Sequence, residues 1–295
     1  MHYFFVVNPN AGQGRAGHTW QRIVQELDRR KVKYSFVETS VPGEATDLTR
    51  DIVEAGYPVV VGVGGDGTMH EIAGGLGPET ILGVIPSGTG NDFALSLGIP
   101  TDPLAALDVL LSAKPQKIDR PSINGRPFLN MSGVGFDATV AKRVREKPPR
   151  GSGSLPYVIM ALRVLAKYQN PRLTIELDGK RIEENVFLVA VGNGAYCAGG
   201  MHMCPKASLQ DGQFDVCIAR DLSKTEALLN MVRIFKGKHI HHPKVSYLRA
   251  RHVRIFGEQV PLYADGEPLG ETPVEYSLEP QSLTVLAPPL NAKPS

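Results

Sequence analysis

The sequence lacks several features that would assign it to a class of protein at once. It has three cysteines, Cys197, Cys204 and Cys217, and no CxxC pair, so we expect neither a disulfide framework nor a cysteine-rich zinc site. No apolar run reaches the ~20 residues of a membrane-spanning helix. The N-terminus has no basic segment followed by a cleavage site, so no signal peptide is expected. These absences indicate a cytoplasmic protein with reduced thiols.

An excess of charge of either sign is also missing. Lys and Arg number 32 and Asp and Glu number 30, which gives a net charge of +2. Such a balance gives no reason to expect nucleic-acid binding. The chain has 295 residues and 42% hydrophobic content, enough for a sizeable core in about two domains.

The first third of the chain alternates between strand and helix patterns. Short β-rich apolar runs predict strands over residues 3–7, 32–37, 58–63 and 81–85. Apolar residues at helical spacing predict helices over residues 16–30, 45–55, 69–76, 91–97 and 103–111. Strands that alternate with helices are typical of βαβ units and a parallel sheet.

The pattern changes near residue 121. Strand-like runs then dominate, separated by Gly, Asp and Pro turns, at residues 128–132, 172–177, 186–191, 214–219, 244–248, 252–256 and 283–286. Helical spacing interrupts them at 155–168 and 224–236. We therefore predict an α/β domain over residues 1–121 and a mostly antiparallel β domain over residues 122–295.

Three polar turns that contain glycine follow strands of the first domain, at residues 8–12, 62–68 and 86–91. The carboxyl ends of parallel strands meet at one edge of a sheet, which is where such sheets bind ligands. We therefore expect the three turns to form one site.

The second turn has the residues that phosphate binding requires. Gly64, Gly65 and Gly67 leave room for backbone N–H groups to approach phosphate just before a helix N-terminus. Asp66 could reach a Mg²⁺ ion, directly or through water, and Thr68 could cap the helix and donate to phosphate. The alternative is a plain turn between a strand and a helix.

Gly62, Gly64 and Gly67 also match the G-x-G-x-x-G fingerprint of dinucleotide-binding proteins. That fingerprint requires an acidic residue at the end of the next strand, and here the next strand ends in Pro86 and Ser87 without an acid. The fingerprint also normally follows a first strand, and this one follows the third. The sequence therefore disfavours an NAD-linked oxidoreductase, and it contains no Walker motif.

Taken in order, the motifs resemble those of diacylglycerol kinase catalytic domains: NPNAG at 8–12, GGDGT at 64–68 and PSGTGNDFA at 86–94. The likeness continues with SGVGFD at 132–137, PKASLQDGQFDV at 205–216 and DGE at 265–267. The chain is similar to the soluble bacterial branch of that family, which includes lipid kinases of the YegS type and is related to sphingosine kinases. GGDGT alone is shared with NAD kinases, whereas the joint set is specific.

The resemblance implies a Rossmann-like, ATP-binding α/β domain and a C-terminal β-sandwich domain for the lipid substrate, with catalysis in the cleft between them. The implied fold is that of NAD kinases and diacylglycerol kinases. Thr39 is assigned by its position after the second strand. The residues implied to bind ATP are Asn8, Pro9, Asn10, Ala11, Gly12, Thr39, Gly64, Gly65, Asp66, Gly67, Thr68, Met69, His70, Thr89, Asn91 and Asp92.

The resemblance also implies two magnesium sites. Asp66, Asp92 and Asp119 would hold the catalytic Mg²⁺ through water. A second, structural Mg²⁺ would bind the Asp211 side chain and the carbonyl oxygens of Ser208 and Gln213. Without the resemblance, Asp211-Gly212 is typical of a tight hairpin turn.

One member of the pair Asp265 and Glu267 is implied to accept the proton of the attacking hydroxyl. We expect Glu267 to be this base, with Asp265 beside it in the cleft and Asp66 at the metal. From spacing alone, a hairpin turn with two solvated acids is the alternative.

These features predict an ATP-dependent lipid kinase that converts diacylglycerol to phosphatidic acid. Phosphatidylglycerol, a sphingoid base and undecaprenol-like alcohols remain open as acceptors. A small-molecule kinase like NAD kinase and a nucleotide-binding regulator without activity are alternatives. The sequence leaves a homodimer open beside a monomer.

A lipid kinase without a spanning helix must contact the membrane transiently, at its inner surface. Basic residues between 142 and 150 precede an apolar segment of helical spacing at 155–165, a combination that suits an anionic membrane. The alternative is a solvated loop followed by a helix that packs on the core.

Overall fold

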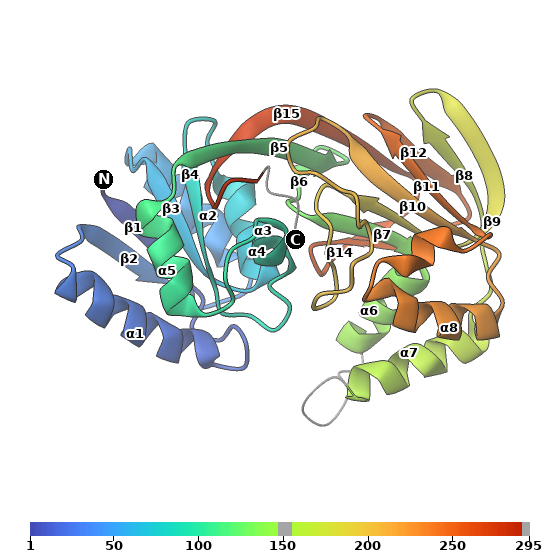
Figure 1. Ribbon diagram of the computed structural model, residues 1–295, viewed down its shortest axis with the longest axis horizontal. Helices are drawn as coiled ribbons and strands as arrows, with labels where there is room; N and C mark the ends of the chain where they lie inside the picture. The colour runs from blue at the N-terminus through green and yellow to red at the C-terminus, as the bar shows by residue number, and fades with distance from the viewer. Residues whose placement is uncertain (147–154, 291–295) are drawn as a thin grey trace.

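The computed structural model of the chain describes residues 1–146 and 155–290. Its N-terminal lobe contains the predicted parallel sheet, in the order β2-β1-β3-β4-β15 (Figure 1). The strands of this lobe that come first in the chain are β1 (Tyr3–Val7), β2 (Tyr34–Glu38), β3 (Val59–Gly64) and β4 (Ile81–Pro86).

Helices cover both faces of this sheet, which is why its strands are continuous apolar runs. On one face α1 (Arg15–Arg29) contacts α5 (Pro103–Ser112), and on the other α2 (Glu44–Glu54) contacts α3 (Asp66–Gly75). The short α4 (Asp92–Ser96) lies beside α3. The fold class predicted for this lobe is confirmed.

The C-terminal lobe is a sandwich of two largely antiparallel layers. One layer consists of β5 (Pro115–Ile123), β6 (Arg126–Pro127), β8 (Arg172–Leu177), β12 (Val253–Gly257) and β15 (Val274–Leu286). The other consists of β7 (Met131–Gly135), β10 (Phe214–Arg220), β11 (Val245–Ala250), β13 (Pro261–Ala264) and β14 (Glu267–Glu271). The long β9 (Lys180–Gly192) pairs with β8 through residues 180–185 and with β7 and β10 through its second half, so it joins the two layers.

Aromatic side chains fill the space between the layers. Phe128, Phe214 and Tyr276 are fully buried there, with ring centroids 6.2 to 6.3 Å apart. Apolar residues alternate toward this core along the strands, as the period of two predicts. The predicted β-sandwich is therefore confirmed.

In the part of this lobe that the structure describes there are three helices and a short 3₁₀ segment, η1 (Lys238–His241). The helices are α6 (Phe136–Glu146), α7 (Leu155–Lys167) and α8 (Lys224–Ile234). None of the described helices is long and apolar enough to cross a membrane. The three cysteines are buried and unpaired, as expected.

Helix α6 was missed from the sequence. Phe136 and Val140 are buried and Val144 is partly buried in the core beneath the helices, at a helical spacing of four. The basic side chains of Lys142, Arg143 and Arg145 therefore project from a packed helix and not from a loop. The rest of the predicted basic segment, residues 147–150, lies outside the described residues.

Two long strands, β5 and β15, run through both lobes (Figure 1). The end of β15 pairs in parallel with β4, where Thr284 lies opposite Ile81, and its beginning pairs with β12. β5 pairs with β15 along most of its length, with a shift of register between Glu279 and Leu283. The last strand of the chain, β15, thus returns to the core of the first lobe. The division of the chain into two domains at residue 121 stays a prediction.

Asp119 fixes the irregular part of this strand pair. Asp119 is fully buried, and its two carboxylate oxygens accept N–H bonds of 2.8 Å, one from Gly212 and one from Gln281. The backbone N–H of Asp119 donates in turn to the carbonyl of Leu209. One carboxylate thus joins β5, β15 and the loop at 208–213.

We predict that Asp119→Ala destabilises the protein by roughly 2–4 kcal/mol, because it leaves the buried N–H of Gly212 and the partly buried N–H of Gln281 without an acceptor. The free energy of unfolding in urea checks this. Asp108→Ala serves as the control, since it removes an exposed ion pair with Arg30 and should change stability by less than about 1 kcal/mol. Equal stability of the two variants would contradict the role given to Asp119.

Candidate functional site

The three glycine turns meet at the carboxyl ends of β1, β3 and β4. A Cβ on Gly12, whose φ is +62°, would lie 2.4 Å from the Ser87 carbonyl oxygen, and one on Gly88 would lie 2.3 Å from the Gly65 Cα. No side chain fits at either contact. Arg15 adds a direct link, because its guanidinium donates to the carbonyl oxygens of both Gly12 and Gly88.

A pocket of about 350 Å³ opens among these turns. Nine of the residues predicted to bind ATP line it: Asn8, Asn10, Ala11, Gly12, Thr39, Gly65, Gly67, Thr68 and Thr89. Residues that the sequence analysis did not assign to it also line it: Ser40, Val41, Pro42, Glu71 and Gly88. Glu267, the predicted base, comes to the same pocket from the other lobe.

Helix α3 begins directly at the pocket. Its N-cap is Gly65, which makes no side-chain cap, and Asp66 is its first residue. The prediction that Thr68 caps the helix is wrong, because Thr68 lies within the first turn and its hydroxyl accepts a 3.1 Å bond from the Asn8 amide. The first N–H groups of α3 therefore have no side-chain cap, which is the arrangement that suits an anion.

The other predicted ATP-binding residues lie around the pocket without being part of its lining. Pro9 and Gly64 belong to the first two turns, and Asn91 closes the third turn by accepting a 2.8 Å bond from the Gly88 N–H. The Met69 side chain is buried in the core, where a Cβ on Gly62 would lie 2.3 Å from its Cε. Only the backbone of Met69 can therefore face a ligand.

Asp66 and Asp92 converge on Gly90. A Cβ on that glycine would lie 2.9 Å from the Asp66 Oδ2 and 3.0 Å from the Asp92 Oδ2. Asp66 accepts a bond from the Phe93 N–H, and Asp92 accepts bonds from the N–H groups of Gly199 and Gly200. Two carboxylates of the first lobe are thus held together beside the turns.

Burial dominates the protonation of both carboxyls. It raises the pKa of Asp66 to about 6. The hydrogen bond from the Phe93 N–H lowers this pKa, whereas the nearby charges of Asp92 and Asp265 raise it further. Burial also raises the pKa of Asp92, although its two backbone N–H bonds oppose the shift. A cation would relieve this repulsion, so the pair has the chemistry of a magnesium ligand.

Asp119 has a different set of contacts. The sequence analysis grouped it with Asp66 and Asp92, but both of its oxygens are used by Gly212 and Gln281. Its contacts attach it to the loop at 208–213, and its membership of a water-mediated acidic network with Asp66 and Asp92 stays a prediction.

Asp265 lies in the two-residue turn between β13 and β14, where its φ of +49° and the +86° of Gly266 form a tight hairpin. Its carboxylate accepts N–H bonds of 2.7, 2.9 and 3.1 Å from Leu129, Asn130 and Met131. It also contacts the His70 Nδ1 at 3.1 Å. The hairpin turn is thereby attached to α3 of the first lobe.

His70 is the imidazole partner of this carboxylate. Burial lowers the pKa of His70, but the hydrogen bond and charge of Asp265 and the charge of Glu267 outweigh it, so the pKa is raised. The imidazolium form is thus favoured in the cleft.

Glu267 reaches across the cleft at the start of β14. A Cβ on Gly67 would lie 3.2 Å from its Oε1, and its Oε2 accepts a 2.8 Å bond from Arg145 of α6. The carboxylate is partly exposed, so it is open to a substrate. A neighbouring ion pair of the same kind joins Lys142 to Glu271 at 3.1 Å.

The predicted structural metal site has a competing cation. Asp211 forms an ion pair with Arg249, and its Oδ1 accepts a 3.2 Å bond from the Gln213 N–H, while Ser208 bonds the Gln210 N–H. Among the described residues no group of three His, Cys, Asp or Glu side chains is arranged to hold a metal. This site stays a prediction, and a metal there would have to displace Arg249.

For some site residues that were not predicted, the neighbouring sequence contained an indication of their role. Arg15 comes three residues after the first turn, and a cation beside a proposed phosphate-binding loop is itself an indication of phosphate binding. Glu71 follows His70, and its carboxylate accepts N–H bonds from Gly43 and Ala45 at the start of α2. Arg145 had no local signal, because its partner lies 122 residues along the chain.

Comparison with known proteins identifies both lobes. Residues 2–123 match the model of the diacylglycerol kinase catalytic domain, and residues 130–287 match that of the YegS C-terminal NAD kinase beta sandwich-like domain. The chain is 30% identical over 287 residues to the diacylglycerol kinase of Staphylococcus carnosus, covering 96% of this chain and 94% of the relative. It is 30% identical over 276 residues to that of Bacillus subtilis, covering 92% and 91%.

A solved structure agrees with these matches. The crystal structure of a candidate diacylglycerol kinase from Bacillus anthracis str. Sterne superposes with a TM-score of 0.81 at 26% identity. The superposition covers 98% of this chain and 95% of that one, so both lobes are shared.

We predict that Asp66→Asn stabilises the protein at neutral pH. The pKa of Asp66 is raised on folding, so its contribution to the free energy of unfolding falls as pH rises from about 4 to about 6. Asparagine does not titrate, so the variant should gain roughly 2–3 kcal/mol at pH 7.5 and nothing at pH 4. Urea denaturation without divalent ions at both pH values measures the difference.

Asp51→Asn is the matched control, because Asp51 is an exposed residue of α2. Its stability should follow that of the unmodified protein at both pH values. A gain for Asp66→Asn that is the same at pH 4 and pH 7.5 would show that the buried charge is not its cause.

Proposed function

The chain belongs to the diacylglycerol kinase family, and we propose that it transfers the γ-phosphoryl group of ATP to a lipid hydroxyl, with diacylglycerol as the first candidate acceptor. The observation that carries this proposal is the position of Glu267. It comes from the C-terminal lobe and lies against Gly67, in a pocket lined by the glycine turns of the N-terminal lobe. A proton acceptor and a phosphate-binding surface thus face the same space.

The glycine turns would bind the phosphates of ATP. Phosphoryl transfer depends mainly on positioning and on neutralisation of charge, and the backbone N–H groups of the turns and of the start of α3 can supply both. Arg15 holds the first and third turns together through two carbonyl oxygens, so it positions this surface.

Asp66 and Asp92 would hold a Mg²⁺ ion, in part through water. Both carboxylates converge on Gly90, where one cation could contact the two of them, and burial raises the pKa of Asp66 to about 6. The ion, when bound, would neutralise charge on the phosphates. His70 lies one turn after Asp66 on α3 and contacts Asp265 of the other lobe, whose charge helps to raise the pKa of His70.

Glu267 would accept the proton of the lipid hydroxyl, since Asp265 is fully engaged. Asp265 accepts three backbone N–H bonds and contacts His70, which leaves it no role as a base. Arg145 orients the Glu267 carboxylate from α6, so Arg145 is a positioning residue. Catalysis at the inner surface of a membrane follows from a lipid acceptor and remains part of the proposal.

We predict that Glu267→Gln lowers kcat by about 10²–10⁴-fold and leaves the Kd for ATP within a few-fold, because a general base is lost and the phosphate surface is not. Glu271→Gln is the matched control: it lies on the same strand, pairs with Lys142 of the same helix, and should keep kcat within about twofold. Near-normal turnover by Glu267→Gln would remove the assignment of the base.

The acceptor is tested with labelled ATP and Mg²⁺ against a panel of diacylglycerol, phosphatidylglycerol, sphingosine, undecaprenol and NAD. Labelled phosphatidic acid is the expected product. Label in another lipid would correct the acceptor, and label in NAD alone would contradict a lipid kinase.

A further inference from the structure

Exposed apolar side chains are concentrated on two helices of the C-terminal lobe. Of the eleven large hydrophobic residues that are exposed in the described part of the chain, seven lie on α7 and on α8 with its C-cap. On α7 they are Val158, Ile159 and Leu162. On α8 and its C-cap they are Leu228, Leu229, Val232 and Phe235, with Leu229 at 68% and Val232 at 74% exposure. Side chains of this kind gather at binding surfaces.

The exposed residues on α8 have a regular spacing. Leu228, Val232 and Phe235 follow at four and three residues, so they form one stripe along the helix, and Leu229 borders it three residues before Val232. Ala227 and Asn230 lie on a different side of the helix, where they are buried. The stripe is therefore a second apolar face, additional to the face that packs on the lobe.

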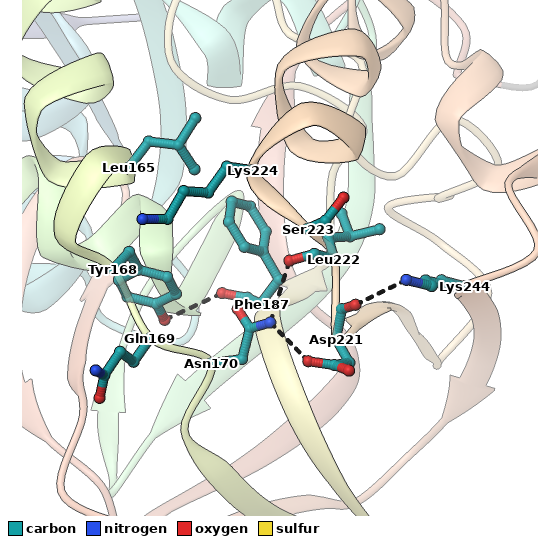
Figure 2. Close-up of a pocket in the computed structure, with 10 residues that line it drawn as sticks. All are labelled: Leu165, Tyr168, Gln169, Asn170, Phe187, Asp221, Leu222, Ser223, Lys224 and Lys244. Carbon is teal, nitrogen blue, oxygen red and sulfur yellow. Dashed lines mark hydrogen bonds between the residues drawn. The ribbon is translucent and has the colours of Figure 1, made fainter.

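The two helices form one unit (Figure 2). Lys224 at the start of α8 donates to the carbonyl of Ala166 at the end of α7, and Asn170, just beyond α7, donates to Asp221 and to the Leu222 carbonyl. Ala161 and Leu165 of α7 and Ala227 of α8 are buried in the same core. Because both helices pack on that core, their exposed faces point away from the same sheet.

Basic side chains accompany this surface. Arg163 and Lys167 are the only charged residues between positions 158 and 168, and Arg233, Lys236 and Lys238 are exposed at the end of α8 and just beyond it. The one acid on α8, Glu226, is already paired with Lys244 at 2.8 Å. The surface is thus apolar and cationic, which is the combination that binds an anionic lipid interface.

We propose that α7 and α8 together form the membrane-docking surface of the protein, and that its partner is an anionic lipid bilayer into which the α8 stripe inserts. This inference rests on the proposed function and deepens it, because it says how the enzyme reaches a lipid acceptor. The proposal assigns the larger share of membrane binding to α8, whereas the sequence analysis indicated residues 142–165.

The surface is connected to the site through α6. Helix α7 packs against α6, and Arg145 and Lys142 of α6 pair with Glu267 and Glu271 of β14. A bilayer seated on α7 and α8 therefore lies against a helix that packs on the element which orients the proposed base. This continuity favours a membrane over a second copy of the chain, which would have no reason to adjoin the acceptor side of the cleft.

The test is sedimentation with vesicles of phosphatidylcholine alone and with vesicles that also contain phosphatidylglycerol, an anionic lipid. The protein should bind the anionic vesicles, and Leu229→Ser with Val232→Ser should weaken this binding at least tenfold. Arg233→Gln should weaken it about fivefold, and only on anionic vesicles. Phe36→Ser, which changes an exposed apolar residue of β2 in the other lobe, is the control and should bind normally.

Activity separates this proposal from the proposed function. With a short-chain diacylglycerol dissolved as monomers, the Leu229→Ser, Val232→Ser variant should turn over normally, and with diacylglycerol in vesicles it should be slow. If no lipid is phosphorylated at all, the proposed function fails, while vesicle binding still decides the docking surface. Normal vesicle binding by the double variant would overturn the proposal, as would a dimer in light scattering that this variant dissociates.

Discussion

The candidate site depends on one buried carboxylate, that of Asp265. It accepts three N–H bonds from the first residue of β7 and the two residues before it, and it contacts His70 of α3, so it fastens the β13–β14 turn to the opposite lobe. A buried charge is tolerated only when hydrogen bonds replace its water, and here four partners do so. Because Glu267 follows two residues later, its position over Gly67 is a consequence of that anchor.

The cleft as a whole concentrates negative charge in a place that water reaches poorly. Asp92 is buried and Asp66 is partly buried beside it, and burial, with a smaller contribution from the charge of Asp265, raises the pKa of both. Such an arrangement is unfavourable for the empty protein and favourable for a metal–nucleotide complex, which brings the missing positive charge. The site is therefore shaped for a ligand at the expense of the stability of the free protein, as functional sites often are.

The sequence alone predicted those parts of the molecule that local pattern controls. β-branched runs between helical segments gave the parallel sheet, and glycine after each strand gave the turns that meet at its edge. It could not show that β15 returns to β4, that Asp119 serves the 208–213 loop, or that Arg145 meets Glu267, because these contacts join segments far apart in the chain. Helix α6 was not predicted because its basic residues resemble those of a loop. The acceptor lipid could not be predicted because its choice depends on the shape of the binding surface, which no sequence motif describes.

The paired strands β5 and β15 form the connection that sets how far apart the two lobes lie. A two-stranded ladder holds its strands together by hydrogen bonds along their length. The register shift between Glu279 and Leu283 would weaken this ladder, but the Asp119 carboxylate accepts the Gln281 N–H there. The width of the cleft is therefore determined by a ribbon whose irregular stretch is itself fastened.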